Sequence, residues 1–89
     1  MIRHLFAMAK DAVALSRREK IRLEELGARI RELRESKGLT LEGVEAKGYT
    51  SWKHLQAIEM GKKNLTLTSL YRLAGALETL PERLIQGLK

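Results

Sequence analysis

Cysteine is absent from the sequence, proline occurs once, and only four of the 89 side chains are aromatic. Without cysteine the chain can form neither a disulfide framework nor a thiolate metal site. The seven glycines and the scarcity of β-branched residues favour an all-α domain with few turns. Its core must be built from Leu, Ile, Val and Ala, and 89 residues suffice for one such core.

Groups that perform catalysis are equally scarce. Asp11 is the single aspartate, and the two histidines, His4 and His54, lie far apart in the sequence. No carboxylate pair, phosphate-binding loop or nucleophile motif appears. Two separated imidazoles without any cysteine do not make a metal site. We therefore expect neither enzymatic activity nor a cofactor or metal.

Long hydrophobic runs are also missing, since no stretch approaches the roughly 18 apolar residues that a membrane-spanning helix needs. The opening residues have a basic start and an apolar middle, as a signal peptide does. Lys10 and Asp11 interrupt that apolar segment, and the charged stretch RREKIR (17–22) follows where a cleavage site would lie. We expect a cytoplasmic protein with no membrane partner.

Positive charge is what the chain has in excess, with a net charge of +6 and a pI near 10.0. A small basic domain often binds a polyanion such as nucleic acid. Residues 1–37 hold ten Lys or Arg against six Asp or Glu, and residues 50–64 hold three lysines against Glu59. In the first of these segments the charges mostly alternate in sign, so solubility is an alternative explanation there.

The N-terminal third has the spacing of amphipathic helix. Apolar side chains recur at helical intervals over residues 2–15 and again from Ile21 to Leu33. Between them, Ser16 and Glu19 form a capping-box pattern that is able to start a new helix. The sequence leaves open whether residues 2–36 form one long helix or two, and Gly38 supplies the stop.

Four shorter helices are expected after Gly38, each with a start signal. They are Leu41–Lys47 capped by Thr40, Trp52–Met60 capped by Thr50 or Ser51, Leu67–Leu77 capped by Thr66, and Pro81–Ile85, which opens on its proline. Leu41 or Val44 is expected to be buried in the first of them and Leu55 and Ile58 in the second. In the third helix the expected inward stripe is Leu67, Leu70, Leu73, Ala74 and Leu77.

Three segments in this order resemble the lambda-repressor-like (Cro-type) helix-turn-helix family. They are RIRELRESKGLT (29–40), IEMGKKN (58–64) and LTSLYRLAGAL (67–77). The resemblance implies a five-helix bundle whose third helix enters the DNA major groove, and binding to double-stranded DNA as a symmetric dimer. We expect such a helix-turn-helix domain over residues 23–89, preceded by an amphipathic, basic helical extension over residues 1–22.

Carried onto this sequence, the resemblance implies two sets of DNA contacts. Polar residues flanking the Leu55 and Ile58 stripe would face base edges, because Lys pairs with guanine and Gln with adenine. The base-facing set is Trp52, Lys53, His54 and Gln56, and the phosphate-contacting set is Ser51, Lys62, Lys63 and Asn64. Weaker candidates for phosphate contact are Arg17, Arg18, Lys20 and Arg22. For Lys62 and Lys63 the alternative is a solvated loop, for His54 a surface position, and for Trp52 a packing role.

The resemblance also implies a structural ion pair between Arg34 and Glu59. Three positions depart from the family pattern. Leu41 stands where the family usually has glutamine, Glu45 stands where it has a small residue, and Tyr49 takes the place of the turn glycine, which lies one position earlier. A shortened turn with an added residue in YTS would let Tyr49 plug the core.

Two functions remain open. The first is a dimeric transcriptional regulator that binds an inverted-repeat operator. The second is a protein-interaction or antitoxin-like module that has kept the bundle but lost operator reading, with Tyr49, Trp52 and Leu41 forming a partner site. A dimer is expected through the N-terminal extension or through the last helix, which carries the apolar residues Leu80, Leu84, Ile85 and Leu88.

Overall fold

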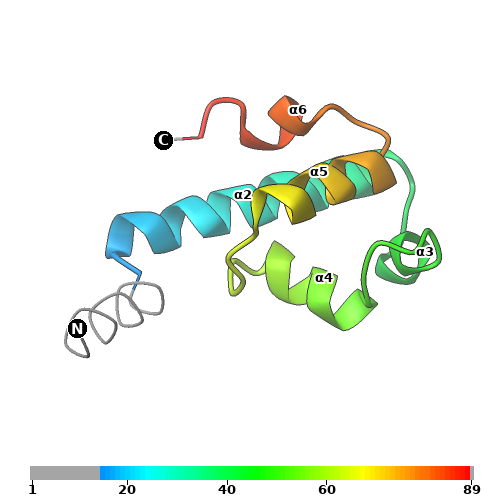
Figure 1. Cartoon of the computed structure of the whole chain (residues 1–89), viewed down its shortest axis with the longest axis horizontal. Coiled ribbons are helices and arrows are strands. Elements are labelled where there is room, and N and C mark those ends of the chain that lie inside the picture. Colours follow the sequence, from blue (N-terminus) through cyan, green and yellow to red (C-terminus); the bar gives the residue numbers. More distant parts are fainter. Residues whose placement is uncertain (1–14, 89) are drawn as a thin grey trace, which may run out of the picture.

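A computed structural model describes residues 15–88 and contains five α-helices in this part of the chain. Their bounds are α2 Arg17–Ser36, α3 Leu41–Glu45, α4 Trp52–Glu59, α5 Leu67–Ala76 and α6 Pro81–Ile85. The all-α, five-helix prediction is confirmed. Figure 1 shows α2 as the long central helix, with α3 and α4 on one side of it and α6 on the other. Over the described residues, no helix combines the length and apolarity that crossing a membrane requires.

The start of α2 answers one question that the sequence left open. The Ser16 hydroxyl accepts the Glu19 N–H at 3.1 Å, and the Ser16 N–H donates to the Glu19 carboxylate at 2.8 Å, which completes a capping box. That backbone donor, helped by the Ser16 hydroxyl, lowers the pKa of Glu19. A new helix therefore begins at Arg17 and runs unbroken through residues 22 and 23. The helix expected over residues 2–15 falls almost wholly outside the described residues.

The other predicted caps are also present. Thr40, Ser51 and Thr66 each accept the backbone N–H three residues ahead, at 3.0, 3.2 and 3.1 Å. Each satisfies one of the donors that a helix start leaves without an intrahelical partner. Of the two candidates for α4, Ser51 is the cap rather than Thr50. Pro81 lies in the first turn of α6, where its missing N–H costs no hydrogen bond.

Three helices end earlier than the sequence predicted. α3 stops at Glu45 rather than Lys47, and α4 and α5 each stop one residue early, at Glu59 and Ala76. After α3 the chain continues in tight turns, with the Lys47 N–H donating to the Val44 carbonyl at 3.0 Å. Since a short helix gains few internal hydrogen bonds, packing decides where it ends.

One buried cluster joins all five helices. Its members are Leu26, Ile30, Val44, Leu55, Ile58, Leu70, Leu73, Ala74, Leu77 and Leu84. Val44 is fully buried whereas Leu41 is half-buried at the edge of the cluster. The inward assignment of Leu67 was wrong, because its side chain is 70% exposed. Leu67 is the first residue of α5, and the cluster does not reach that end of the helix.

Gly27 sets how closely α2 and α4 approach each other. A methyl group on Gly27 would lie 2.5 Å from the carbonyl oxygens of both Ile58 and Glu59. These are backbone atoms, so the clash could be relieved only by moving the whole of α4 away from α2. The glycine therefore permits the contact that positions the C-terminal end of α4.

We predict that Gly27→Ala destabilises the fold by about 1–3 kcal/mol or more, as overpacking does in tightly packed cores. Gly75 is the matched control, since it also lies inside a helix but a methyl group added to it would have no atom within 4 Å. Gly75→Ala should be neutral or stabilise by up to about 1 kcal/mol through helix propensity. Urea unfolding of both variants measures the difference. Equal stabilities for the two would contradict the role of Gly27.

The Arg34–Glu59 ion pair predicted from the resemblance is present and buried. Arg34 donates to the two Glu59 oxygens at 2.7 and 3.0 Å, and its third contact is to the Leu39 carbonyl at 2.7 Å. The two side chains are only 9% and 6% exposed. The Glu59 carboxylate raises the pKa of Arg34, so the guanidinium stays charged throughout the accessible pH range. The pair joins α2 to the last residue of α4.

We predict that Arg34→Met or Glu59→Gln alone costs about 3–5 kcal/mol of folding free energy, because each leaves one buried charge without its partner. The double variant should cost clearly less than the sum of the two. Chemical denaturation of the four proteins in this cycle gives the coupling energy. Additive losses would show that the two side chains act independently.

Candidate nucleic-acid interface

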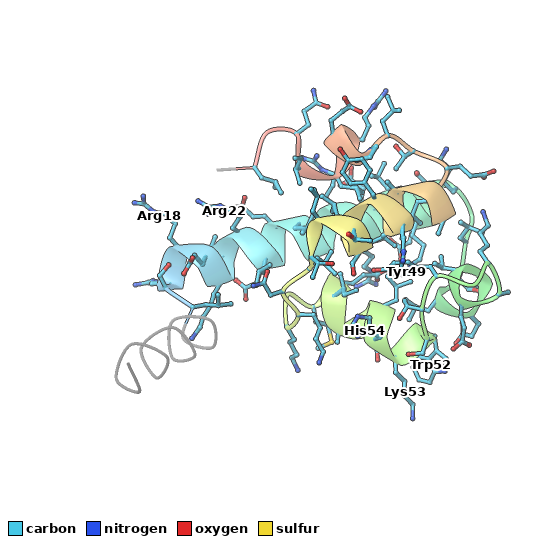
Figure 2. All side chains as sticks on the ribbon, in the orientation of Figure 1. Arg18, Arg22, Tyr49, Trp52, Lys53 and His54 are labelled. Carbon is cyan, nitrogen blue, oxygen red and sulfur yellow. The ribbon has the colours of Figure 1, made fainter. Side chains whose placement is uncertain are left out.

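The exposed face of α4 carries a stripe of side chains that begins with two polar residues, Lys53 and Gln56. Leu55 and Ile58 turn into the core, with exposures of 0% and 2%. Lys53 and Gln56 lie on the opposite side and are exposed, and Met60, seven positions after Lys53, continues this stripe with 54% exposure. In Figure 2 the Lys53 side chain projects away from the bundle. Met60 is a surface residue that the sequence analysis missed, although its spacing from Lys53 points to it.

Trp52 and His54 occupy the two flanks of that stripe and are half-buried. Figure 2 shows Trp52 at the end of α4 that lies nearest to α3. The Lys53 ammonium lies 5.7 Å from the centroid of the Trp52 ring, within the range of a cation–π contact. The four residues predicted to face bases therefore divide into two that point outward and two that line the edges.

The residues predicted to contact phosphate lie at the two ends of α4. Lys62, Lys63 and Asn64 are exposed in the loop that follows the helix, and the Lys62 N–H donates to the Ala57 carbonyl at 2.9 Å. Gly61, with φ of +76°, makes the turn into this loop. Ser51 lies at the start of the helix, where its hydroxyl oxygen already accepts the His54 N–H and its hydroxyl proton remains able to donate.

Glu45 holds the start of α4 as well, a contact that the sequence analysis did not foresee. Its carboxylate accepts the Trp52 N–H at 3.1 Å, so the first and third N–H groups of α4 bind Glu45 and Ser51 respectively. An acidic side chain satisfies such donors and interacts favourably with the positive end of the helix dipole. The sequence held one indication of this contact, because Glu45 is a charged residue at a position where the family usually has a small one.

In the connection between α3 and α4, Tyr49 packs against the core as the sequence suggested. Gly48 adopts φ of +83°, and Tyr49 directly after it is half-buried and packs against the core cluster. Burial raises the pKa of the Tyr49 hydroxyl, an effect that Ser69 and the Arg72 charge partly oppose. Leu41 is likewise packed at the edge of the core, so its apolar side chain replaces a polar anchor with a packing contact.

Of the basic residues at the start of α2, Lys20 lines a surface depression with Lys62 and Asn64 at the end of α4, whereas Arg18 and Arg22 lie elsewhere. Figure 2 shows Arg18 and Arg22 projecting from the side of α2 that faces away from α4, whereas Lys53 projects in the opposite direction. Arg18, Ile21, Arg22 and Glu25 line a shallow surface depression there. Among residues 15–88, no group of three or more His, Asp or Glu side chains is placed to hold a metal ion.

Comparisons with known proteins agree with this geometry. A model of the helix-turn-helix family matches residues 30–84, well over half of the chain. The chain is 44% identical over 52 residues to the uncharacterized HTH-type transcriptional regulator y4dJ of Sinorhizobium fredii, covering 58% of this chain and 68% of the relative. Its fold is similar to that of the restriction-modification controller protein C.AhdI from Aeromonas hydrophila, with a TM-score of 0.66 and 34% identity over 70% of this chain and 94% of that one.

The matched region begins at Ile30 in α2 and ends at Leu84 in α6, so it contains the ion pair, the α3–α4 turn and the outward face of α4. Within this unit α4 holds the place of the recognition helix. The protein belongs to the lambda-repressor-like helix-turn-helix family of DNA-binding domains.

Proposed function

We propose that the protein is a cytoplasmic transcriptional regulator that binds an inverted-repeat DNA operator as a homodimer. The observation that carries this proposal is the exposed stripe of α4, where Lys53 and Gln56 point outward and are followed by two exposed lysines, Lys62 and Lys63, beyond the end of the helix. In helix-turn-helix complexes the recognition helix lies in the major groove and its N-terminal residues contact base edges.

The side chains on this face suit different parts of a duplex. Lys53 suits the guanine O6 and N7 acceptors, and Gln56 suits the paired donor and acceptor of adenine. Lys62 and Lys63 lie beyond the end of α4, where the DNA backbone would pass on either side of the groove, and they supply affinity without sequence information. Arg18 and Arg22 face the other side of α2 and are left out of this interface.

The second copy of the chain, in this proposal, packs on an apolar groove that extends to the loop after α4, where Asn64 also lines it. The groove, about 450 Å³ in volume, lies between α2, α5 and α6. Its apolar lining residues are Leu23, Leu26, Leu65, Leu67, Leu70, Ile85 and Leu88. Leu67 and Ile85 at its rim are 70% and 49% exposed, which suits burial in a symmetric interface. Leu84, one of the expected interface residues, is already fully buried within the monomer.

The competing role as a module that binds a protein through Tyr49, Trp52 and Leu41 has less support. All three side chains are half-buried, and two of them pack against the core. A docking patch requires these side chains to be exposed together. The large apolar side chains that are exposed belong to other parts of the described chain: Ile21, Met60, Leu67, Tyr71, Leu80 and Ile85.

We predict that selection from random duplexes with the wild-type protein recovers an inverted repeat, whereas the Lys53→Ala/Gln56→Ala variant loses that preference. Each lost base contact should cost about 1–3 kcal/mol on the selected site. Arg18→Ala, which removes one charge on the opposite side of α2, is the control and should recover the same repeat. Sequence-blind binding by the wild-type protein would refute the proposed function.

The two loop lysines should behave differently from the two helix residues. Lys62→Ala/Lys63→Ala should weaken binding to all duplexes alike and reduce the slope of log affinity against log salt by about one per lysine. The measurement is fluorescence anisotropy over a salt series. A loss confined to the selected site would assign the lysines to base reading instead.

We predict that Leu67→Glu shifts a dimer to monomer without unfolding it, because Leu67 opens α5 and an acidic residue there favours the helix dipole. Leu80→Glu is the control, since Leu80 is 61% exposed but does not line the groove. Sedimentation equilibrium of both variants, and of the chain lacking residues 1–14, measures the change. A dimer that survives Leu67→Glu but not the truncation would place the interface in the N-terminal segment.

A further inference from the structure

The N-terminal end of a recognition helix has an intrinsic attraction for any phosphate. Its first N–H groups have no intrahelical partners, and the helix dipole adds a positive field. Such an attraction is independent of sequence, so it contributes most where phosphate contacts supply nearly all of the binding, as they do on non-specific DNA.

In this protein a carboxylate occupies that end of α4. Glu45, the last residue of α3, accepts the Trp52 N–H at 3.1 Å, while Ser51 accepts the His54 N–H at 3.2 Å. The contact spans seven positions in the sequence and is made across the α3–α4 turn, so it fixes the two helices relative to each other. Glu45 is also exposed, and no ion pair with a neighbouring cation within residues 15–88 neutralises it.

Among the described residues, the lysine in the first turn of α4 forms no ion pair with this carboxylate. The Lys53 ammonium lies over the Trp52 ring, 5.7 Å from its centroid. The start of the recognition helix therefore presents a negative charge, an indole and a lysine held by the indole. A phosphate approaching along the helix axis meets the carboxylate, whereas a base edge approaching from the side meets Lys53 and Gln56.

We propose that Glu45 is a selectivity residue, which positions the start of α4 and repels phosphate from it so that binding depends on base contacts. This inference rests on the proposed DNA-binding function and extends it to a residue that does not itself read a base. The repulsion lowers affinity for non-specific DNA more than for the operator. On the operator the base contacts fix α4 in the groove, whereas a non-specific complex derives almost entirely from phosphate contacts and can bring a phosphate to this helix end. A repulsive element of this kind is a common source of specificity.

The test compares Glu45→Gln, which retains an acceptor for the Trp52 N–H but no charge, with Glu45→Ala, which removes both. Binding to a random-sequence duplex and to the selected site is measured at low and high salt. Glu45→Gln should bind the random duplex about three- to tenfold more tightly at low salt, as expected for removing one unit charge about 5–8 Å from phosphates. The gain should shrink at high salt and be smaller on the selected site, so the specificity ratio falls.

Glu32→Gln is the matched control, since Glu32 is exposed on α2 and borders Arg29 and Arg83 of α6 rather than α4. It makes the same change in net charge and should leave both affinities within about twofold. Amide exchange of Trp52 is the structural readout. It should be faster in Glu45→Ala than in the wild-type protein and little changed in Glu45→Gln. The single tryptophan also reports any shift of the helix start through its fluorescence.

The outcomes separate the two proposals. If the wild-type protein binds duplexes in a salt-sensitive way but Glu45→Gln matches it within twofold on the random duplex, the selectivity role of Glu45 is overturned and the DNA-binding function stands. If Glu45→Gln binds both duplexes more weakly, Glu45 supports the fold alone and the role is again overturned. If the wild-type protein shows no salt-sensitive binding to any duplex, the proposed function fails and this inference fails with it.

Discussion

The buried pair of Arg34 and Glu59 is the interaction on which the orientation of the recognition helix depends. The guanidinium binds both carboxylate oxygens and the Leu39 carbonyl, so one side chain joins α2, the loop after α2 and the end of α4. Two charges in a nearly dry site are tolerated only when their hydrogen bonds are completed in this way. The geometry of α4 is therefore tied to α2, and that constraint positions the surface proposed to face DNA.

The two ends of α4 are held by different chemistry. At its C-terminal end the backbone approaches Gly27 so closely that no other residue fits, and Glu59 completes the attachment. At its N-terminal end Ser51 and Glu45 accept backbone N–H groups. A helix fixed at both ends has little freedom to adjust to a mismatched DNA site. Such rigidity suits sequence-specific binding by the outward side chains of α4 better than non-specific binding.

Much of the fold was predictable from local chemistry. Capping residues precede α2, α3, α4 and α5 at the expected positions, because a helix start needs acceptors for its free N–H groups wherever the helix lies. The spacing of Leu55 and Ile58 predicted the inward face of α4 for a similar reason. The misplaced residue Leu67 shows the limit, since periodicity gives the face of a helix but not how far along it the core extends.

The candidate site was predictable only in part. The sequence named Lys53, Gln56, Lys62 and Lys63, and all four side chains are exposed in the structure. The sequence did not predict that the Glu45 carboxylate accepts the Trp52 N–H. The two residues belong to different helices, and their contact depends on the shape of the intervening turn.

The sequence by itself determined the helix starts, the inward stripes, the excess of positive charge and the family pattern, since each of these follows from composition or from the order and spacing of residues along the chain. The tertiary structure alone decided the close approach at Gly27, the half-burial of Trp52 and Tyr49, and the charge that Glu45 places at the start of α4. These features depend on distances between separate helices, which are set by the packing of the whole core.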